Sequence, residues 1–147
     1  MERSGLKERK GRRHDQMIFK YILLWFPMVL IAIFNALLRE SVYGSFMSAL
    51  RAHQVSSLTA IIFFGIYVWL ISGRWRIESG QQALVIGLIW VVMTVAFEFL
   101  FGHYVMGHPW SRLLADYNLL AGRTWSLVLL GTLILPYVAY WLRSGGE

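Results

Sequence analysis

Four long apolar segments alternate with short polar connections along the chain. They cover residues 17–38, 55–72, 82–104 and 124–142. Each has close to the roughly 20 apolar residues that an α-helix needs to cross the hydrocarbon core of a bilayer. Since a backbone in hydrocarbon must satisfy its own hydrogen bonds, the segments are expected to be helical. The pattern predicts an all-α, polytopic membrane protein, with four transmembrane helices in a single domain over residues 17–143.

A shorter amphipathic pattern lies between the third and fourth segments, over residues 109–121. Its apolar positions recur at helical spacing and are Trp110, Leu113, Leu114, Tyr117 and Leu120. Proline is favoured at the first position of a helix and glycine just past its end. Pro109 and Gly122 are therefore expected to bound this helix, with His108 as its cap. The pattern is typical of a short amphipathic helix that lies in the membrane interface.

The remaining segments are polar. Residues 1–16 are expected to form a basic, poorly ordered cytoplasmic tail, and residues 144–147 a short tail at the other end. Residues 39–54 connect the first two segments. Within them an apolar spacing that suits a second short interfacial helix is formed by Tyr43, Met47 and Leu50.

The positive charge is distributed unevenly along the chain. The net charge is +6, and seven of the 14 Lys and Arg residues lie in the first twenty positions. Four spans place both termini on one side, which then carries ten Lys and Arg against four on the other. Because positive residues concentrate on the cytoplasmic side, both termini are expected there, in a multi-pass inner-membrane protein. The basic tail is expected to contact anionic lipid, and no nucleic-acid partner is predicted.

Polar and ionisable side chains gather near the outer ends of the predicted helices. These candidate site residues are Asn35, Arg39, Glu40, His53, Gln54, Glu98, His103, Asp116, Tyr117 and Arg123. Glu98 lies six residues before the end of its segment, or about 9 Å deep. A carboxylate at that depth is costly unless it has a partner. We expect Glu98 to form an ion pair with Arg39 or Arg123, through the bidentate geometry of arginine.

Three interpretations of the outer cluster are compared: a site for an anionic ligand, a structural ion-pair network and a metal site. Arginines with histidines and tyrosines suit an anionic ligand, and an ion-pair network that only holds the outer helix in place uses the same residues. A metal ion would need ligands from His53, Glu98, His103 and His108. Glu98 and His103 are five residues apart and diverge by about 140° on a helix, and the arginines repel cations. No metal is predicted, and haem is not favoured.

Catalytic motifs are missing from the sequence. Ser56 and Ser57 offer hydroxyls, but there is no G-x-S-x-G, no H-E-x-x-H and no Gly-rich phosphate loop. The chain has no cysteine, which excludes disulfides and thiolate nucleophiles. No catalytic residue or cofactor is predicted, and enzyme activity is left open but not favoured.

Several short blocks resemble a family of small bacterial four-helix integral membrane proteins. The blocks are Leu38-Arg39-Glu40, Ala52-His53-Gln54, Phe97-Glu98-Phe99, Leu113-Leu114-Ala115-Asp116-Tyr117 and Gly122-Arg123. The resemblance implies the four-helix membrane fold and a bacterial inner membrane. That family has no established activity, so the resemblance implies no substrate and assigns no role to any residue.

We expect the protein to bind, and by extension to translocate, a small polar or anionic ligand at an outer-leaflet polar pocket. The alternatives are a non-catalytic accessory or structural subunit of a larger membrane complex and, third, a lipid-modifying enzyme. Four spans enclose little volume, so the expected partners besides the lipid bilayer are further copies of the chain, as a homo-oligomer, or the other subunits of a membrane complex.

Overall fold

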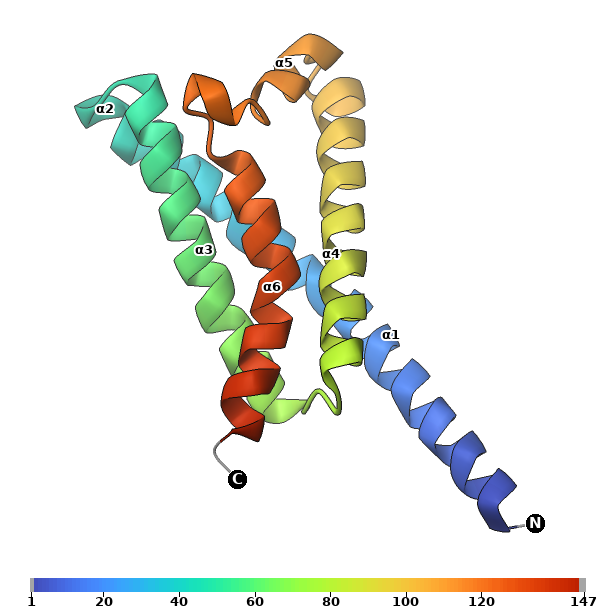
Figure 1. Cartoon of the computed structure of the whole chain (residues 1–147). Helices are drawn as coiled ribbons and strands as arrows, with labels where there is room; N and C mark the ends of the chain where they lie inside the picture. Colours follow the sequence, from blue (N-terminus) through green and yellow to red (C-terminus); the bar gives the residue numbers. More distant parts are fainter. Residues whose placement is uncertain (1, 146–147) are drawn as a thin grey trace.

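The computed structural model describes residues 2–145, and all of their regular structure is helical (Figure 1). In order, the elements are α1 (Glu2–Leu38), the π-helix η1 (Arg39–Tyr43), α2 (Gly44–Phe46), α3 (Ala49–Arg74), α4 (Gly80–Leu100), the π-helix η2 (Phe101–Val105), α5 (Trp110–Ala115), the 3₁₀-helix η3 (Leu119–Ala121) and α6 (Trp125–Ser144). Within residues 2–145, four helical stretches are long and apolar enough to cross a membrane. The predicted fold class is confirmed.

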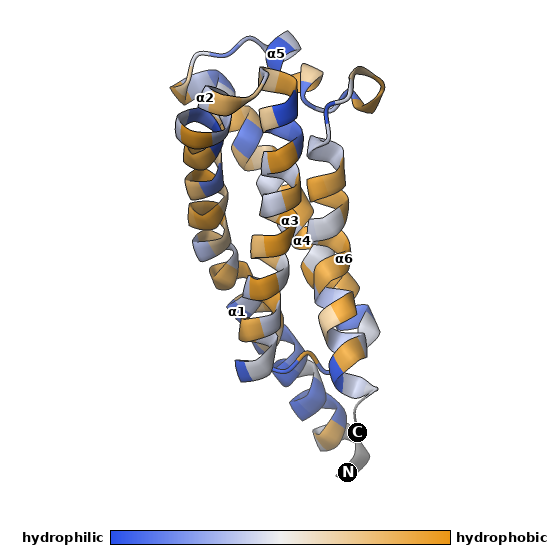
Figure 2. Ribbon diagram, turned by 90° about the vertical axis from the view of Figure 1, so that its left-hand side faces the viewer, coloured by the Kyte–Doolittle hydropathy of each residue, from blue (hydrophilic) through white to orange (hydrophobic). Residues whose placement is uncertain are grey.

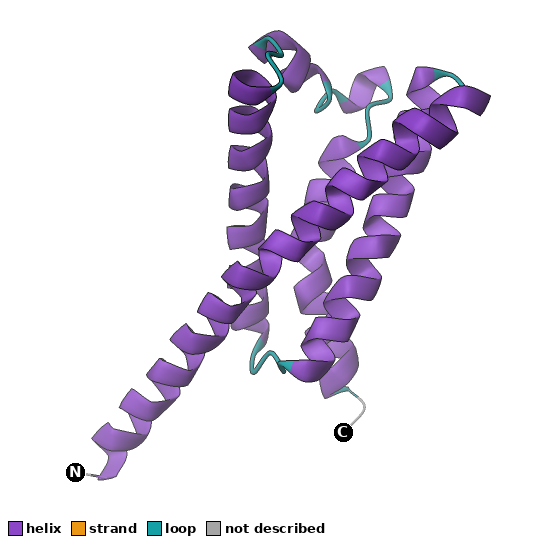
Figure 3. Ribbon diagram, turned by 180° about the vertical axis from the view of Figure 1, so that it is seen from behind, coloured by secondary structure: helices purple, strands orange, loops and turns teal. Residues whose placement is uncertain are grey.

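The four long helices run alternately up and down, so both termini lie at the same end of the molecule (Figure 1). α6 packs between α3 and α4, and α1 packs against the same two helices. We call the end opposite the termini the distal end; it carries α2 and α5 (Figure 1). α1 crosses the bundle obliquely, from α4 near the termini to α3 near the distal end (Figure 3).

Apolar side chains at helical spacing fill the centre of the bundle. On α1 and α4 they are Tyr21, Trp25, Met28, Ala83, Ile86 and Trp90. The polar atoms of these aromatic rings have partners, as buried aromatic donors generally do. The indole of Trp90 donates to the carbonyl oxygen of Tyr21 at 2.7 Å, and the indole of Trp25 donates to Thr94 Oγ1 at 3.0 Å. These two bonds fix α1 against α4 around the middle of α4.

Apolar residues predominate along the long helices (Figure 2), and many of them are exposed on the outward faces. On α3, the exposed positions recur every four residues and are Leu58, Ile62, Ile66 and Leu70. A soluble protein rarely leaves such a continuous apolar surface in water. In a bilayer these side chains contact lipid, while the backbone groups behind them are bonded within the helix. The inward and the outward faces of the helices are therefore both apolar, as expected for a membrane protein.

A close contact joins α4 to α6. A β-carbon added at Gly87 would lie only 2.1 Å from the carbonyl oxygen of Leu133, so only glycine fits there. Small residues let helix backbones approach closely in membranes, where packing drives association. Gly87 is therefore the residue that allows the close approach of α4 and α6.

The helix boundaries differ from the prediction at the N-terminal end of α1. Residues 2–16 were expected to be poorly ordered, but α1 begins at Glu2 and is continuous through the basic segment. Lys, Arg and Glu are good helix formers, and no proline interrupts the segment. Glu8 and Arg12, one turn apart, also form an exposed ion pair at 3.8 Å.

The distal connections are shorter and less regular than predicted. Residues 39–54 do not form the predicted separate helix. The first helix continues through η1 into α2, and α3 then begins at Ala49. The predicted helix over 109–121 divides into α5 and η3. Its N-cap is Pro109, not His108. Gly122 does end the segment in the left-handed conformation, with φ of 77°, as predicted for a C-terminal glycine.

Candidate functional site

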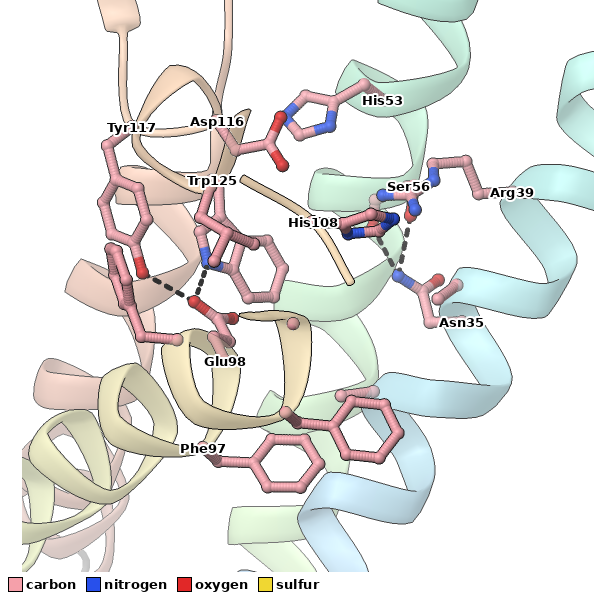
Figure 4. A pocket seen from close by; sticks show the side chains of 16 residues that line it. Asn35, Arg39, His53, Ser56, Phe97, Glu98, His108, Asp116, Tyr117 and Trp125 are labelled. Atoms are coloured by element: carbon pink, nitrogen blue, oxygen red, sulfur yellow. Dashed lines mark hydrogen bonds between the residues drawn. The ribbon is translucent and has the colours of Figure 1, made fainter. Parts of the chain in front are cut away.

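A pocket of about 280 Å³ opens at the distal end, between α1, α3, α4 and the segment that joins α4 to α6 (Figure 4). Its polar lining comes from segments far apart in the sequence. Six of the predicted site residues line it, namely Asn35, Arg39, His53, Glu98, Asp116 and Tyr117. Each lies near the distal end of its own helix or in the α4–α6 connection, and the up-and-down packing of the helices brings these ends together.

Glu98 lies at the inner side of this pocket and accepts two hydrogen bonds. The hydroxyl of Tyr117 donates to its Oε2 at 2.6 Å, and the indole nitrogen of Trp125 donates to the same oxygen at 2.8 Å (Figure 4). Tyr117 lies outside the spanning helices. Burial, followed by its hydrogen bond to Glu98, raises the pKa of the Tyr117 hydroxyl above its ordinary value. Tyr117 therefore remains a proton donor to the carboxyl group.

The predicted ion pair of Glu98 with Arg39 or Arg123 is wrong. Arg123 instead pairs with Asp116, with 3.3 Å between Nη1 and Oδ1. Arg39 has a longer contact of 3.7 Å with its neighbour Glu40. Within residues 5–145, the hydrogen bonds to Glu98 come from the uncharged donors Tyr117 and Trp125. Two neutral donors satisfy the buried oxygen without the added cost of desolvating a guanidinium.

Asn35 fastens the distal end of α1 to α3. Its Nδ2 donates to the carbonyl oxygen of Ser56 at 2.8 Å and to the Ser56 hydroxyl at 2.9 Å. Its Oδ1 accepts a hydrogen bond from Thr59 at 2.7 Å. Asn35 is 3 % exposed, so these bonds satisfy an amide that burial would otherwise penalise. Asn35 therefore has a structural role at the wall of the pocket.

His53 differs from its neighbours in lacking a partner. It is only 4 % exposed and lines the pocket from α3. In the part of the chain that the structure describes, its Nε2 is a buried side-chain atom with no hydrogen-bond partner. Leaving such an atom unsatisfied costs about 1–3 kcal/mol. A buried ring nitrogen at a pocket wall is suited to bind a polar group that enters the pocket.

A second cavity, of about 220 Å³, lies next to the first at the distal surface. It shares Arg39, His53 and Asp116 with the pocket and is also lined by Arg112 and Arg123. We call it the arginine vestibule. Its three arginines come from η1, α5 and the connection just before α6, so it forms only when these segments are packed together. Arg123, predicted as a site residue, lies here rather than in the main pocket.

Three predicted site residues lie outside both cavities. Glu40 is exposed and contacts Arg39, and Gln54 donates to the carbonyl oxygen of Gly122 at 3.1 Å. His103 stacks on Trp110 with 3.8 Å between ring centroids, and its Nδ1 lies 2.9 Å from the carbonyl oxygen of His108. Gln54 and His103 thus hold the distal connection in place rather than face the pocket.

Several lining residues were not predicted. Ser56, Phe97, His108 and Trp125 all face the pocket. Ser56 lies one turn from His53 on α3, and that spacing could have identified it. Phe97 and Trp125 look like ordinary lipid or core residues in the sequence. His108 lies in an irregular connection, where no periodicity indicates the direction of a side chain.

The histidines and carboxylates do not gather into a metal site. Among the described residues there is no group of three or more His, Asp or Glu side chains that could hold a metal ion. The four ligands that the metal hypothesis required are divided, since His103 packs against Trp110 away from the pocket. The metal hypothesis therefore gains no support from the geometry.

Comparison with known proteins gives no further guidance. No protein-family model, no curated protein and no solved structure matches this chain. The resemblance to small bacterial four-helix membrane proteins therefore stays a prediction, and the site must be interpreted from its own geometry.

Proposed function

We propose that the protein binds a small anionic ligand in the distal pocket and its arginine vestibule. The observation that carries the proposal is the buried, unpartnered Nε2 of His53, a residue that lines both cavities. One ring nitrogen of a neutral imidazole carries a hydrogen and can donate it to an anion, and a nearby guanidinium can add a charge-assisted hydrogen bond.

The balance of charge around the cavities favours an anion. Their lining contains three arginines and two carboxyl groups. Asp116 is already paired with Arg123, and Glu98 is held by Tyr117 and Trp125. The contact of Arg39 with Glu40 is long, and the Glu40 side chain is 73 % exposed, so water screens this pair. Arg39 is therefore the cation most available to a ligand.

Binding is a better-supported activity than transport by a single chain. Below the pocket, toward the termini, the bundle is filled by large side chains such as Tyr21, Met28 and Trp90, each less than 3 % exposed. A path through the protein would have to displace them, or run between copies of the chain. The pocket is consistent with a ligand that enters and leaves at the distal end.

The same proposal includes an orientation in the membrane. We infer that the termini lie in the cytoplasm and that the pocket faces the outer leaflet of a bacterial inner membrane. Support comes from the ten Lys and Arg residues near the termini against four at the distal end, namely Arg39, Arg51, Arg112 and Arg123.

The proposal is tested with the purified protein in detergent and inorganic phosphate as the probe, followed by phosphorus NMR. Phosphate should bind to the wild type, and Arg39→Gln should weaken binding by about tenfold, or roughly 1.4 kcal/mol. Arg51→Gln is the matched control, because Arg51 lies at the same end but is exposed and lines neither cavity. Equal affinities in the two variants, or no binding to the wild type, would contradict the proposal.

A further inference from the structure

An apolar cavity of about 200 Å³ continues from the pocket toward the middle of the bundle. It is lined from α1 by Met28, Val29 and Ile33, and it shares Ala32, Phe97 and Glu98 with the pocket. We call it the α1–α4 slot. Glu98 lies where the pocket and the slot meet, so the two cavities form one space with a polar lining at one end and an apolar lining at the other.

The slot exists because α1 leaves α4 as it crosses the bundle (Figure 3). The hydrogen bond from Trp25 to Thr94 fixes α1 to α4 at one level, and the bonds of Asn35 with Ser56 fix it to α3 further along. Between these levels α1 presents Ala32 to the gap, and Ala36 lines it just beyond Asn35; the small side chains of both residues leave it unfilled.

The side of the slot reaches the lipid-facing surface. Ile33 on α1 and Phe101 at the start of η2 both line it, and they are 43 % and 40 % exposed. A hydrocarbon chain in the surrounding bilayer can therefore contact the slot from the side, without passing through water. A wholly water-soluble ligand would leave this apolar surface unused.

The three cavities together match an amphiphile. From the distal surface inward, the lining changes from the arginine vestibule to the polar pocket and then to the α1–α4 slot. Arg39 marks the charged end and Met28 the apolar end. The eleven residues that separate them span roughly 16 Å of helix. The arginines attract an anionic head group and repel a cationic one, so charge complementarity selects an anionic head group.

We propose that the ligand is a phosphate-bearing lipid whose head group contacts Arg39, Arg123 and His53 and whose hydrocarbon chain lies in the α1–α4 slot. This rests on the proposed function, because it identifies the ligand class of the same pocket. The phosphate group supplies the anionic oxygens for the guanidinium groups and for Nε2 of His53. The chain supplies the apolar contact that a free phosphate cannot make.

The test compares dodecyl phosphate with inorganic phosphate. The purified protein is held in a neutral dodecyl maltoside micelle, and binding is followed by native mass spectrometry for the lipid analogue and by phosphorus NMR for inorganic phosphate. Val29→Trp fills the slot without changing the lining of the pocket or the vestibule. Val92→Trp is the matched control, because Val92 is 59 % exposed on α4 and lines none of these cavities.

We expect the wild type to bind dodecyl phosphate at least tenfold more tightly than inorganic phosphate. Val29→Trp should lose that advantage and keep its affinity for inorganic phosphate, Val92→Trp should behave like the wild type, and Arg39→Gln should bind both probes more weakly. If Val29→Trp also loses its affinity for inorganic phosphate, Ile33→Trp is used instead, because Ile33 is a more exposed residue of the slot. Ile33→Trp should then lose the advantage for dodecyl phosphate and keep its affinity for inorganic phosphate.

The outcomes separate the two proposals. If dodecyl phosphate binds no more tightly than inorganic phosphate, or if filling the slot leaves its affinity unchanged, the lipid inference fails and the anion pocket remains. If the wild type binds neither probe, both proposals fail together.

Discussion

At the scale of single residues, Glu98 determines how the distal end is held together. One of its oxygens accepts hydrogen bonds from Tyr117, in the α4–α6 connection, and from Trp125, at the start of α6. The carboxyl group of α4 therefore joins two segments that follow it in the chain. Since it needs no guanidinium, Arg39 remains free of Glu98 and faces the cavities.

Replacing Tyr117 by Phe should lower stability. The change removes the 2.6 Å hydrogen bond to Glu98 and keeps the ring, which packs on Phe99 with 5.7 Å between centroids. A hydrogen bond to a carboxyl group contributes roughly 1.5–3 kcal/mol when that group is charged, so thermal unfolding in detergent should occur at a lower temperature. Tyr104→Phe is the control, because Tyr104 is 72 % exposed, and this variant should unfold like the wild type. Equal losses in both variants would disprove the role of the bond.

The contribution of Tyr117 to the stability of the folded protein should also depend on pH. Because burial and Glu98 raise the pKa of Tyr117 in the folded state, the folded protein holds this proton more tightly than the unfolded chain. The unfolded tyrosine loses its proton near pH 10, so the stabilisation is complete below about pH 10 and declines as pH rises further. The difference in unfolding temperature between the wild type and Tyr117→Phe should therefore shrink above about pH 10. A difference that stays constant would contradict this.

At the scale of elements, the α4–α6 contact should be the least tolerant of added volume. In an ordinary helix Gly→Ala stabilises by roughly 0.5–1 kcal/mol. At Gly87 the added carbon would meet a backbone oxygen at 2.1 Å, so Gly87→Ala should instead destabilise, by at least the roughly 1–3 kcal/mol of an overpacked core. Gly65→Ala is the control, since its new carbon meets only a flexible Leu135 side chain at 3.6 Å. Thermal unfolding of both variants measures the difference, and a stable Gly87→Ala would mean that α4 and α6 are further apart.

The helices were predictable because their signals are local. The apolar blocks define four spans, and the positions of Asn35, His53 and Glu98 near the same ends of their segments predicted a shared cluster. The predictions that failed concern side-chain contacts, which residue spacing does not determine. The partner of Glu98 was sought among charged residues, whereas the donors are neutral: Tyr117, in a connection whose path is irregular, and Trp125, at the start of α6. The slot arises from the crossing of α1, which no sequence period reveals.

At the scale of the whole molecule, the two ends of the bundle differ in chemistry. The end with the termini carries the basic stretch of α1, and Arg143 there donates to the carbonyl oxygen of Trp69 at 2.6 Å and lies 4.0 Å from the centroid of its ring. The distal end carries fewer positive charges, and three of its four arginines, Arg39, Arg112 and Arg123, line the cavities. In the proposed orientation, positive charge near the termini keeps that end in the cytoplasm, and positive charge at the distal end lines the proposed site.

The proposed orientation can be measured directly because the chain has no cysteine. Single cysteines can be introduced at Ser111, an exposed residue of α5 at the distal end, and at Ser144, an exposed residue at the end of α6 near the termini. A membrane-impermeant maleimide should label Ser111→Cys in intact bacterial cells, and should label Ser144→Cys only after the cells are lysed. The physical reason is the ten-to-four excess of Lys and Arg near the termini, which favours keeping that end in the cytoplasm. The reverse labelling pattern would place the pocket in the cytoplasmic leaflet and overturn the orientation, while leaving the chemistry of the pocket to be tested separately.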